Sequence, residues 1–242
     1  MTQEERDDRR LAFLGRLAGG LAHEIRNPLS TIAMNLQLLQ EDWADPETDR
    51  ERRTVRKLEV LAKEVKRLES ILGDFLRYAG RDKLEKLPTR LNDVVEEVLE
   101  FMGPKFAEGG VELRFFVGEQ LPKILVDRDA VKQVLMNLVL NAIQAMPDGG
   151  ELMVRTALDA AGAVVLEVTD TGEGIPEELL EKIWDVYYSR RKTGTGMGLP
   201  TARRIVEEHD GDMTVVSEHG KGTRFTIRIP VFAGLLDEGE EA

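Results

Sequence analysis

The chain has 242 residues and a mass of 27.2 kDa, and 42% of its residues are apolar and 32% charged, a balance that excludes wholesale disorder. It has no cysteine, which excludes disulfides and thiolate metal sites, and no apolar run near the ~18 residues of a membrane helix. Its 33 basic and 45 acidic residues give a net charge of −12, which argues against nucleic acid as the main partner. We therefore expect a cytoplasmic protein.

The charge is unevenly distributed along the chain. Residues 1–87 contain 17 basic and 17 acidic residues, so the whole net charge lies in the remainder. This change in net charge along the chain, together with Pro88, predicts a domain boundary near residue 85. We expect one domain over 1–85, a second over 86–235, and an acidic tail over 236–242.

Two long amphipathic helices are predicted in the first region. Apolar residues recur at steps of three and four from Leu11 to Leu39 and again from Val55 to Ala79. The polar stretch Asp42–Arg50 is predicted to be the turn between them. One hairpin leaves each apolar stripe half covered, so we expect a second copy to complete a four-helix bundle. The alternative is a monomeric hairpin packed on the rest of the chain.

His23 lies on the outer face of the first predicted helix. At 100° per residue it points about 180° from the apolar seam, and Asn27 lies one turn along on the same face. An exposed histidine can offer a neutral ring nitrogen as a nucleophile. Taken alone, it is equally a surface histidine without a role.

The second region alternates between helical and extended patterns. Helices are predicted over about 92–106, 129–146 and 198–209, with a short helix after Pro176. Strands are predicted over about 111–117, 151–158, 164–170, 212–217 and 223–229. Interleaved helices and mostly antiparallel strands predict an α/β sandwich with the helices on one face of the sheet.

A stripe of uncharged carboxamides follows the helix predicted over 129–146. Gln133, Asn137, Asn141 and Gln144 fall within about 80° of one another, and most of the remaining circumference is apolar. A buried amide needs a partner, and an amide oxygen can complete the shell of Mg²⁺. The stripe therefore indicates either a metal–phosphate site or an internal amide network.

Two glycine clusters follow this helix. Asp170-Thr171-Gly172-Glu173-Gly174 comes directly after a predicted strand, and a carboxylate there can accept a hydrogen bond from an exocyclic amine such as that of adenine. Gly194-Thr195-Gly196-Met197-Gly198-Leu199 leads into a helix, an arrangement suited to phosphate. Arg190, Arg191 and Lys192 come just before it. They are either a basic cluster that holds a polyanion or part of a solvated loop.

Together these segments resemble the sensor histidine kinases of two-component systems. Residues 23–29 (HEIRNPL) resemble the H-box of that family, residues 137–142 (NLVLNA) its N-box, and the two glycine clusters its glycine boxes. Residues 220–225 resemble its closing signature. The match runs over about residues 11–230 in the family's order. Residues 198–203 (GLPTAR) place it nearest the nitrogen-regulation-like branch.

The resemblance implies a dimerising phosphotransfer hairpin followed by a GHKL-type ATP-binding domain. It implies that His23 accepts the phosphoryl group, that Glu24 is its hydrogen-bond acceptor and base, and that Asn27 belongs to a phosphatase signature, unless it merely caps the bend at Pro28. Asn141 would bind Mg²⁺, Asp170 would bind adenine, and residues 185–196 would form a lid. The other implied ATP-binding residues are Asn137, Gln144, Gly172, Gly174, Arg191, Lys192, Gly194, Thr195, Gly196, Gly198, Leu199 and Thr223.

The chain departs from the family pattern in a few places. Tyr187 and Tyr188 replace the usual pair of phenylalanines, Arg191 replaces a lysine, and Asp210-Gly211 replaces a double glycine. Nothing before Leu11 resembles a sensor domain. We expect either a separate sensor protein or a catalytic core taken from a longer chain.

The expected function is ATP-dependent autophosphorylation on His23 in a homodimer, followed by transfer to an aspartate of a response regulator. Two alternatives stay open at this point. One is a non-catalytic nucleotide-binding scaffold that regulates a partner by docking. The other is a plain ATPase of the same nucleotide fold.

Overall fold

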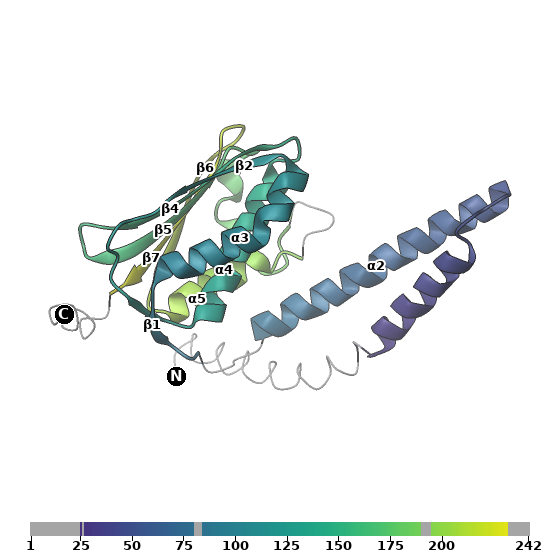
Figure 1. Ribbon diagram of the computed structural model, residues 1–242, viewed down its shortest axis with the longest axis horizontal. Coiled ribbons are helices and arrows are strands. Elements are labelled where there is room, and N and C mark those ends of the chain that lie inside the picture. Colours follow the sequence, from purple (N-terminus) through teal and green to yellow (C-terminus); the bar gives the residue numbers. More distant parts are fainter. Residues whose placement is uncertain (1–24, 26, 80–83, 190–194, 232–242) are drawn as a thin grey trace. The chain divides into compact units, whose positions relative to one another are not determined.

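The structure is a computed structural model that describes residue 25 and residues 27–79, 84–189 and 195–231 (Figure 1). The chain divides into two compact units. One is the helical unit before residue 83, and the other is an α/β unit made of residues 83–188 and 198 onward.

The helical unit is a hairpin of two helices (Figure 1). The described part of the first helix covers residues 27–42, and α2 covers Asp49–Ala79. Helix α2 begins inside the predicted turn because Thr48 and Glu51 form a reciprocal cap. The Thr48 hydroxyl accepts from Glu51 N at 3.2 Å, and the Glu51 carboxylate accepts from the backbone of Glu47 and Thr48. These backbone donors lower the pKa of Glu51.

The apolar seam of the hairpin is only partly covered. Leu36 and Val65 are buried, but many other apolar side chains of the two helices are exposed. These include Ile25, Ile32, Met34, Leu38, Leu39, Val60, Leu61 and Leu68. Within the described residues, no helix has the length and apolarity that crossing a bilayer requires.

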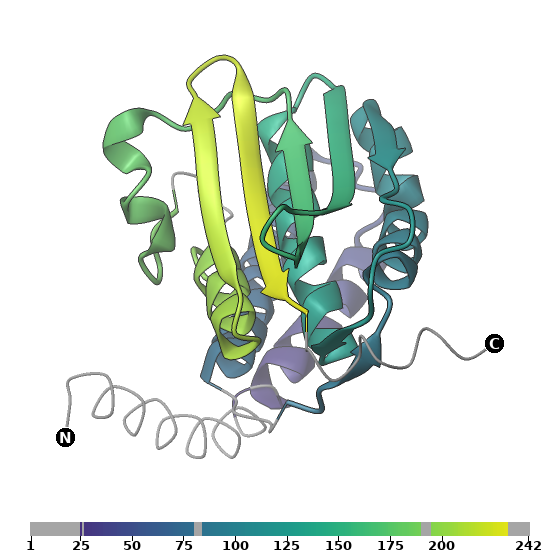
Figure 2. The same cartoon turned by 90° about the vertical axis from the view of Figure 1, so that its left-hand side faces the viewer.

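A five-stranded sheet forms one layer of the α/β unit. Its strand order is β2-β4-β5-β7-β6, with β2 and β4 parallel and the other pairs antiparallel. Figure 2 shows the sheet in front of the helices. The strands are β2 (Val111–Phe116), β4 (Gly150–Leu158), β5 (Ala163–Asp170), β6 (Asp212–Glu218) and β7 (Gly222–Pro230).

Three helices cover one face of this sheet and form the second layer (Figure 2). They are α3 (Leu91–Gly109), α4 (Arg128–Ala145) and α5 (Gly198–Glu208). The core between the layers joins residues such as Leu135 and Leu138 of α4 to Leu152 and Ile227 of the sheet, all almost fully buried. The predicted α/β sandwich with helices on one face is confirmed.

Some elements differ from the predictions. A second, two-stranded sheet pairs β1 (Leu87–Thr89) with β3 (Ile124–Val126), and neither strand was predicted. Pro88 argues against a strand, but it is tolerated here because β1 has only one partner. The helix expected after Pro176 is instead two single 3₁₀ turns, η1 (Glu177–Leu179) and η2 (Lys182–Trp184).

Candidate nucleotide site

Helix α4 carries the amide stripe of the site. Asp127 caps its amino-terminal end by accepting from the backbone of Asp129 and Ala130, both at 3.0 Å. On the stripe, Asn137 Nδ2 donates to Gly198 O at 3.0 Å, which joins α4 to the first residue of α5. Asn141 is also half-buried, but within the described chain its carboxamide makes no hydrogen bond.

The stripe is less enclosed than the sequence suggests. Gln133, Asn137 and Asn141 are half-buried, whereas Gln144 is exposed, and only the opposite side of α4 is buried. Since most of the circumference of α4 is apolar, the sequence predicts a helix that is buried nearly all round, and this prediction is wrong. Apolar residues beside the stripe, such as Met136 and Leu140, are also only partly buried. The stripe is thus accessible to a ligand.

Asp170 ends strand β5 and is almost fully buried. Its Oδ1 accepts from Gly172 N at 2.9 Å, which closes a tight turn after the strand. In the sheet register it lies opposite Thr223 of β7, which is also buried. A Cβ on Gly172 would lie 2.5 Å from Ala145 O, so this turn packs directly on the carboxyl-terminal end of α4.

Gly174 lies where the turn after β5 meets the turn between β6 and β7. It has a φ of +65°, and a Cβ there would overlap the carbonyl oxygen of Glu218. Gly220 N donates to Glu173 O at 2.7 Å across the same contact. Only glycine combines this backbone conformation with such a close approach. The β6–β7 turn therefore forms one wall of the glycine loop.

The sequence did not predict the role of Ser217. Its Oγ accepts from Ile175 N and donates to Gly222 O, both at 2.8 Å. With that proton engaged, the Thr223 hydroxyl donates to Ser217 Oγ at 2.9 Å. The sequence signal that could have indicated this role is the position of Ser217, three residues before Gly220 and five before Gly222. Both glycines have positive φ in the structure.

Trp184 anchors the segment that precedes the predicted lid. Its ring contacts Phe225 edge-on at 6.2 Å, and Arg203 lies over it at 5.0 Å. Tyr187, three residues later, has a φ of +69°, which is rare for a bulky residue. Beyond it, Gly196 also has positive φ, and Met197 N donates to Thr195 Oγ1 at 3.5 Å.

The remaining predicted site residues are placed as follows. Gly198 and Leu199 begin α5, and Asn27 is exposed in the hairpin, where its carbonyl accepts from Thr31 Oγ1 at 3.0 Å. The structure therefore brings together residues of the N-box, the first glycine box, the start of α5 and the closing signature. Predicted site residues that lie outside the described residues are His23, Glu24, Arg191, Lys192 and Gly194.

His209 is not a site residue. It is buried; its Nε2 accepts from Asp127 N at 2.9 Å and its Nδ1 lies 2.7 Å from Ile205 O. Both ring nitrogens are thus engaged in the neutral Nδ1–H tautomer, and His209 is unavailable as a phosphoryl acceptor.

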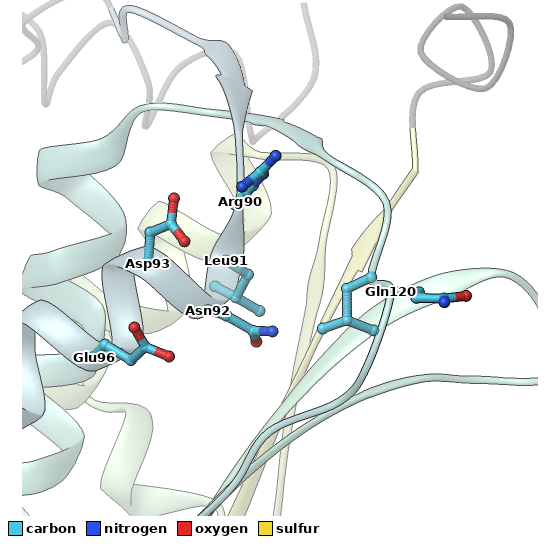
Figure 3. A pocket seen from close by; sticks show the side chains of 7 residues that line it. Arg90, Leu91, Asn92, Asp93, Glu96 and Gln120 are labelled. Carbon is cyan, nitrogen blue, oxygen red and sulfur yellow. The ribbon is translucent and has the colours of Figure 1, made fainter. Parts of the chain in front are cut away.

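A separate cavity of about 400 Å³ lies at the amino-terminal end of α3. Figure 3 shows Arg90, Asp93, Glu96 and Gln120 at its edge. None of the residues that line it belongs to the predicted nucleotide site.

Two family models match the chain. Residues 126–233 match the histidine kinase-, DNA gyrase B- and HSP90-like ATPase family, and residues 13–84 match the His Kinase A (phospho-acceptor) domain. The first match contains the helix and glycine segments described above, and the second contains the hairpin.

The chain is similar to known sensor histidine kinases. It is 35% identical over 232 residues to the sensor histidine kinase ZraS of Escherichia coli K12, a match covering 96% of this chain and 48% of ZraS. The chain thus spans about half the length of the curated relatives it matches.

Solved structures give the same result. Full-length ShkA in complex with AMPPNP matches 89% of this chain and 45% of ShkA, with a TM-score of 0.71 and 26% identity. Histidine kinase ThkA in complex with the response regulator protein TrrA matches 95% of this chain and 65% of ThkA, with a TM-score of 0.67 and 30% identity. The family models, the curated relatives and the fold all agree, and the chain belongs to the sensor histidine kinases of two-component systems.

Proposed function

We propose that this chain uses ATP to phosphorylate His23 and then passes the phosphoryl group to an aspartate of a response regulator. The observation that carries the proposal is the hydrogen bond from Asn137 to Gly198 O, which joins the N-box helix to the start of the helix after the second glycine box. The complexes of ShkA with AMPPNP and of ThkA with the response regulator protein TrrA support it by similarity. We further propose that the domains extend over 1–85 and 86–235, with an acidic tail over 236–242.

Asp170 and the glycine loop are suited to the adenine end of ATP. The buried Asp170 carboxylate can accept from the exocyclic amine, and the turn that follows it packs directly on the carboxyl-terminal end of α4 at Gly172. The amino-terminal end of α5 supplies backbone N–H groups and a positive dipole for the phosphates. Arg191 and Lys192 would add positive charge there.

Asn141 fits the role of a Mg²⁺ ligand. Its carboxamide is half-buried and makes no hydrogen bond within the described chain, whereas Asn137 one turn earlier is engaged. An amide oxygen is a suitable hard ligand for Mg²⁺, which keeps most of its shell for water and phosphate oxygens. Bound there, Mg²⁺ would neutralise the charge that develops on the phosphates.

Phosphoryl transfer then depends on positioning. The Nε2 atom of His23 attacks the γ-phosphorus in line, an N–P bond forms, and the bond to the β-phosphate oxygen breaks to release ADP. Glu24 accepts the Nδ1–H of His23, which fixes the tautomer and stabilises the imidazolium. A carboxylate oxygen of the regulator aspartate next attacks phosphorus and releases neutral His23.

The exposed face of the first helix is suited to receive the regulator. Met34 and Leu38 follow Asn27 by seven and eleven residues, and each exposes more than half of its surface. At this spacing they lie within about 20° of Asn27 around the helix. We also propose that Asn27 orients a water for attack on the regulator phosphoaspartate, which releases phosphate.

The uncovered seam of the hairpin supports a homodimer. Ile25, Ile32 and Leu39 follow the predicted seam, yet each exposes more than 40% of its surface in a single chain. A second hairpin would cover them in a four-helix bundle. A separate sensor protein as a further partner and the cytoplasmic location stay predictions.

The decisive experiment incubates the protein with γ-labelled ATP and Mg²⁺. The label should be acid-labile and alkali-stable, as a phosphohistidine is. Because both nitrogens of His209 are engaged, the candidates are His23 and His219. His23→Ala should abolish the label while ATP binding remains nearly intact, and His219→Gln should retain the label. ATP hydrolysis without label on the parent would favour a plain ATPase, and binding without turnover a scaffold.

A further inference from the structure

Residues 84–89, where the chain enters the α/β unit after the helical hairpin, are held there by two contacts that four side chains make or support. We call this group the linker clamp, and it consists of Lys86, Asp127, His209 and Asp210. Glu85 N donates to Asp127 Oδ2 at 3.0 Å, and Lys86 Nζ forms an ion pair with Asp210 Oδ2 at 3.1 Å. Strand β1 follows at once and pairs with β3 in the register Leu87↔Val126.

Asp127 is the centre of the clamp because it has two functions. One carboxylate oxygen caps α4, the helix that carries Asn137 and Asn141, and the other accepts the linker amide of Glu85. Partial burial raises the pKa of Asp127, but the N–H donors of Ala130, Glu85 and Asp129 outweigh it and hold the pKa below its ordinary value. The carboxylate is therefore ionised when it holds both segments.

His209 and Asp210 join the carboxyl-terminal end of α5 to the same point. Asp127 N donates to the buried Nε2 of His209. Asp210 has a φ of +58°, a conformation that favours glycine, at a position where the family pattern has a double glycine. An aspartate in this conformation gives the linker an ionic partner that glycine cannot provide.

We propose that Asp127 is a positioning residue for histidine phosphorylation, because the linker clamp keeps the connection between the two units short. This inference rests on the proposed kinase function. Helix α2 ends at Ala79 and the clamp begins at Glu85, so five residues, 80–84, lie between them. They span at most about 18 Å.

Opening the clamp would lengthen the stretch of chain between α2 and the first clamped residue of the α/β unit. With β1 released as far as α3, which begins at Leu91, the connection becomes eleven residues, 80–90. Under the proposed function the five-residue connection is already long enough for phosphorylation, and beyond that length the effective concentration of one unit near the other falls roughly as the −3/2 power of tether length, which gives about a threefold decrease. The expected effect is a lower maximal rate of phosphorylation with an unchanged affinity for ATP.

The test is the double variant Asp127→Asn/Asp210→Gly in the full chain. Asparagine is as good a helix cap as aspartate, so α4 stays capped while an NH₂ group faces Glu85 N–H. Glycine removes the ionic partner of Lys86 and suits the positive φ of residue 210. The remaining strand β1 has three residues and one partner, which is marginal in isolation. The matched control is Asp129→Asn/Glu119→Gly, which changes exposed acidic residues outside the clamp.

Three measurements distinguish the outcomes. Hydrogen exchange in the peptide 84–91 should become faster in the double variant only, the ATP affinity should stay within twofold, and the phosphorylation rate at saturating ATP should fall about threefold. Unchanged hydrogen exchange in this peptide overturns the proposal. Faster exchange with an unchanged or higher phosphorylation rate also overturns it. A variant that loses ATP affinity shows a structural role for Asp127 instead, and also overturns it. A parent protein that takes no label refutes the kinase function, whereas the exchange result still tests the clamp.

Discussion

A single methyl group at Gly174 should damage the nucleotide site, and Gly162 provides the matched control. Both glycines have positive φ, at +65° and +82° respectively. A Cβ on Gly174 would overlap Glu218 O and come within 3.1 Å of His219 Cα, whereas a Cβ on Gly162 would meet nothing within 4 Å. The two alanine variants therefore share the backbone strain and differ only in the close approach.

The expected losses of unfolding free energy follow from the backbone strain and from the close approach. An L-residue in the left-handed region costs ~1–2 kcal/mol, which is the whole expected loss of unfolding free energy for Gly162→Ala. Overpacking in a well-packed region adds ~1–3 kcal/mol, so Gly174→Ala should lose ~2–5 kcal/mol. Since the displaced loop follows Asp170, Gly174→Ala should also weaken ATP binding at least tenfold, and Gly162→Ala should not.

Urea denaturation followed by tryptophan fluorescence measures the stability of the α/β unit. The chain has two tryptophans, so a Trp43→Phe background leaves Trp184, which contacts Phe225 of the sheet, as the reporter. Calorimetry then measures the ATP affinity of the folded variants. Equal stability losses in the two alanine variants, with equal ATP affinity, would refute the argument that the Glu218 carbonyl requires a glycine at residue 174.

The other predictions concern the metal, the regulator and acid stability. Asn141→Ala should weaken ATP binding in Mg²⁺ far more than in EDTA. Asn137→Ala should weaken ATP binding in both conditions, because it also loses the hydrogen bond to Gly198 O. Equal Mg-ATP affinity in the Asn141→Ala variant and the parent would exclude Asn141 as a ligand. Asn27→Ala should keep His23 phosphorylation within severalfold but strongly slow dephosphorylation of the regulator, measured on one preparation; an unchanged dephosphorylation rate contradicts that role. Because the pKa of Asp127 lies below its ordinary 3.8, its ionised carboxylate stabilises the fold above that pH, and the stabilisation is lost as the pH falls through the folded value. The stability difference between the parent and Asp127→Asn should therefore be constant from pH 7 to about 5 and close in stronger acid, and urea midpoints that differ equally at all pH values would contradict this.

The periodic elements of the α/β unit were predictable from the sequence. Helices α3, α4 and α5 and the strands of the five-stranded sheet appear within a few residues of their expected bounds, because each has a long apolar repeat of one period. The amide stripe and the glycine clusters also indicated the candidate site, since amides at steps of three and four and clustered glycines are visible without any tertiary contact.

Other features depend on partners far apart in the chain. Strand β1 is three residues long and contains Pro88, so only its pairing with β3, nearly forty residues away, makes it a strand. Ser217 and Gly174 become part of the nucleotide site because the β6–β7 turn folds onto the loop after Asp170. His209 is engaged because the fold places its Nε2 against Asp127 N, more than eighty residues away in the chain. A sequence pattern reports local periodicity, whereas these contacts arise only when the sheet register brings distant segments together.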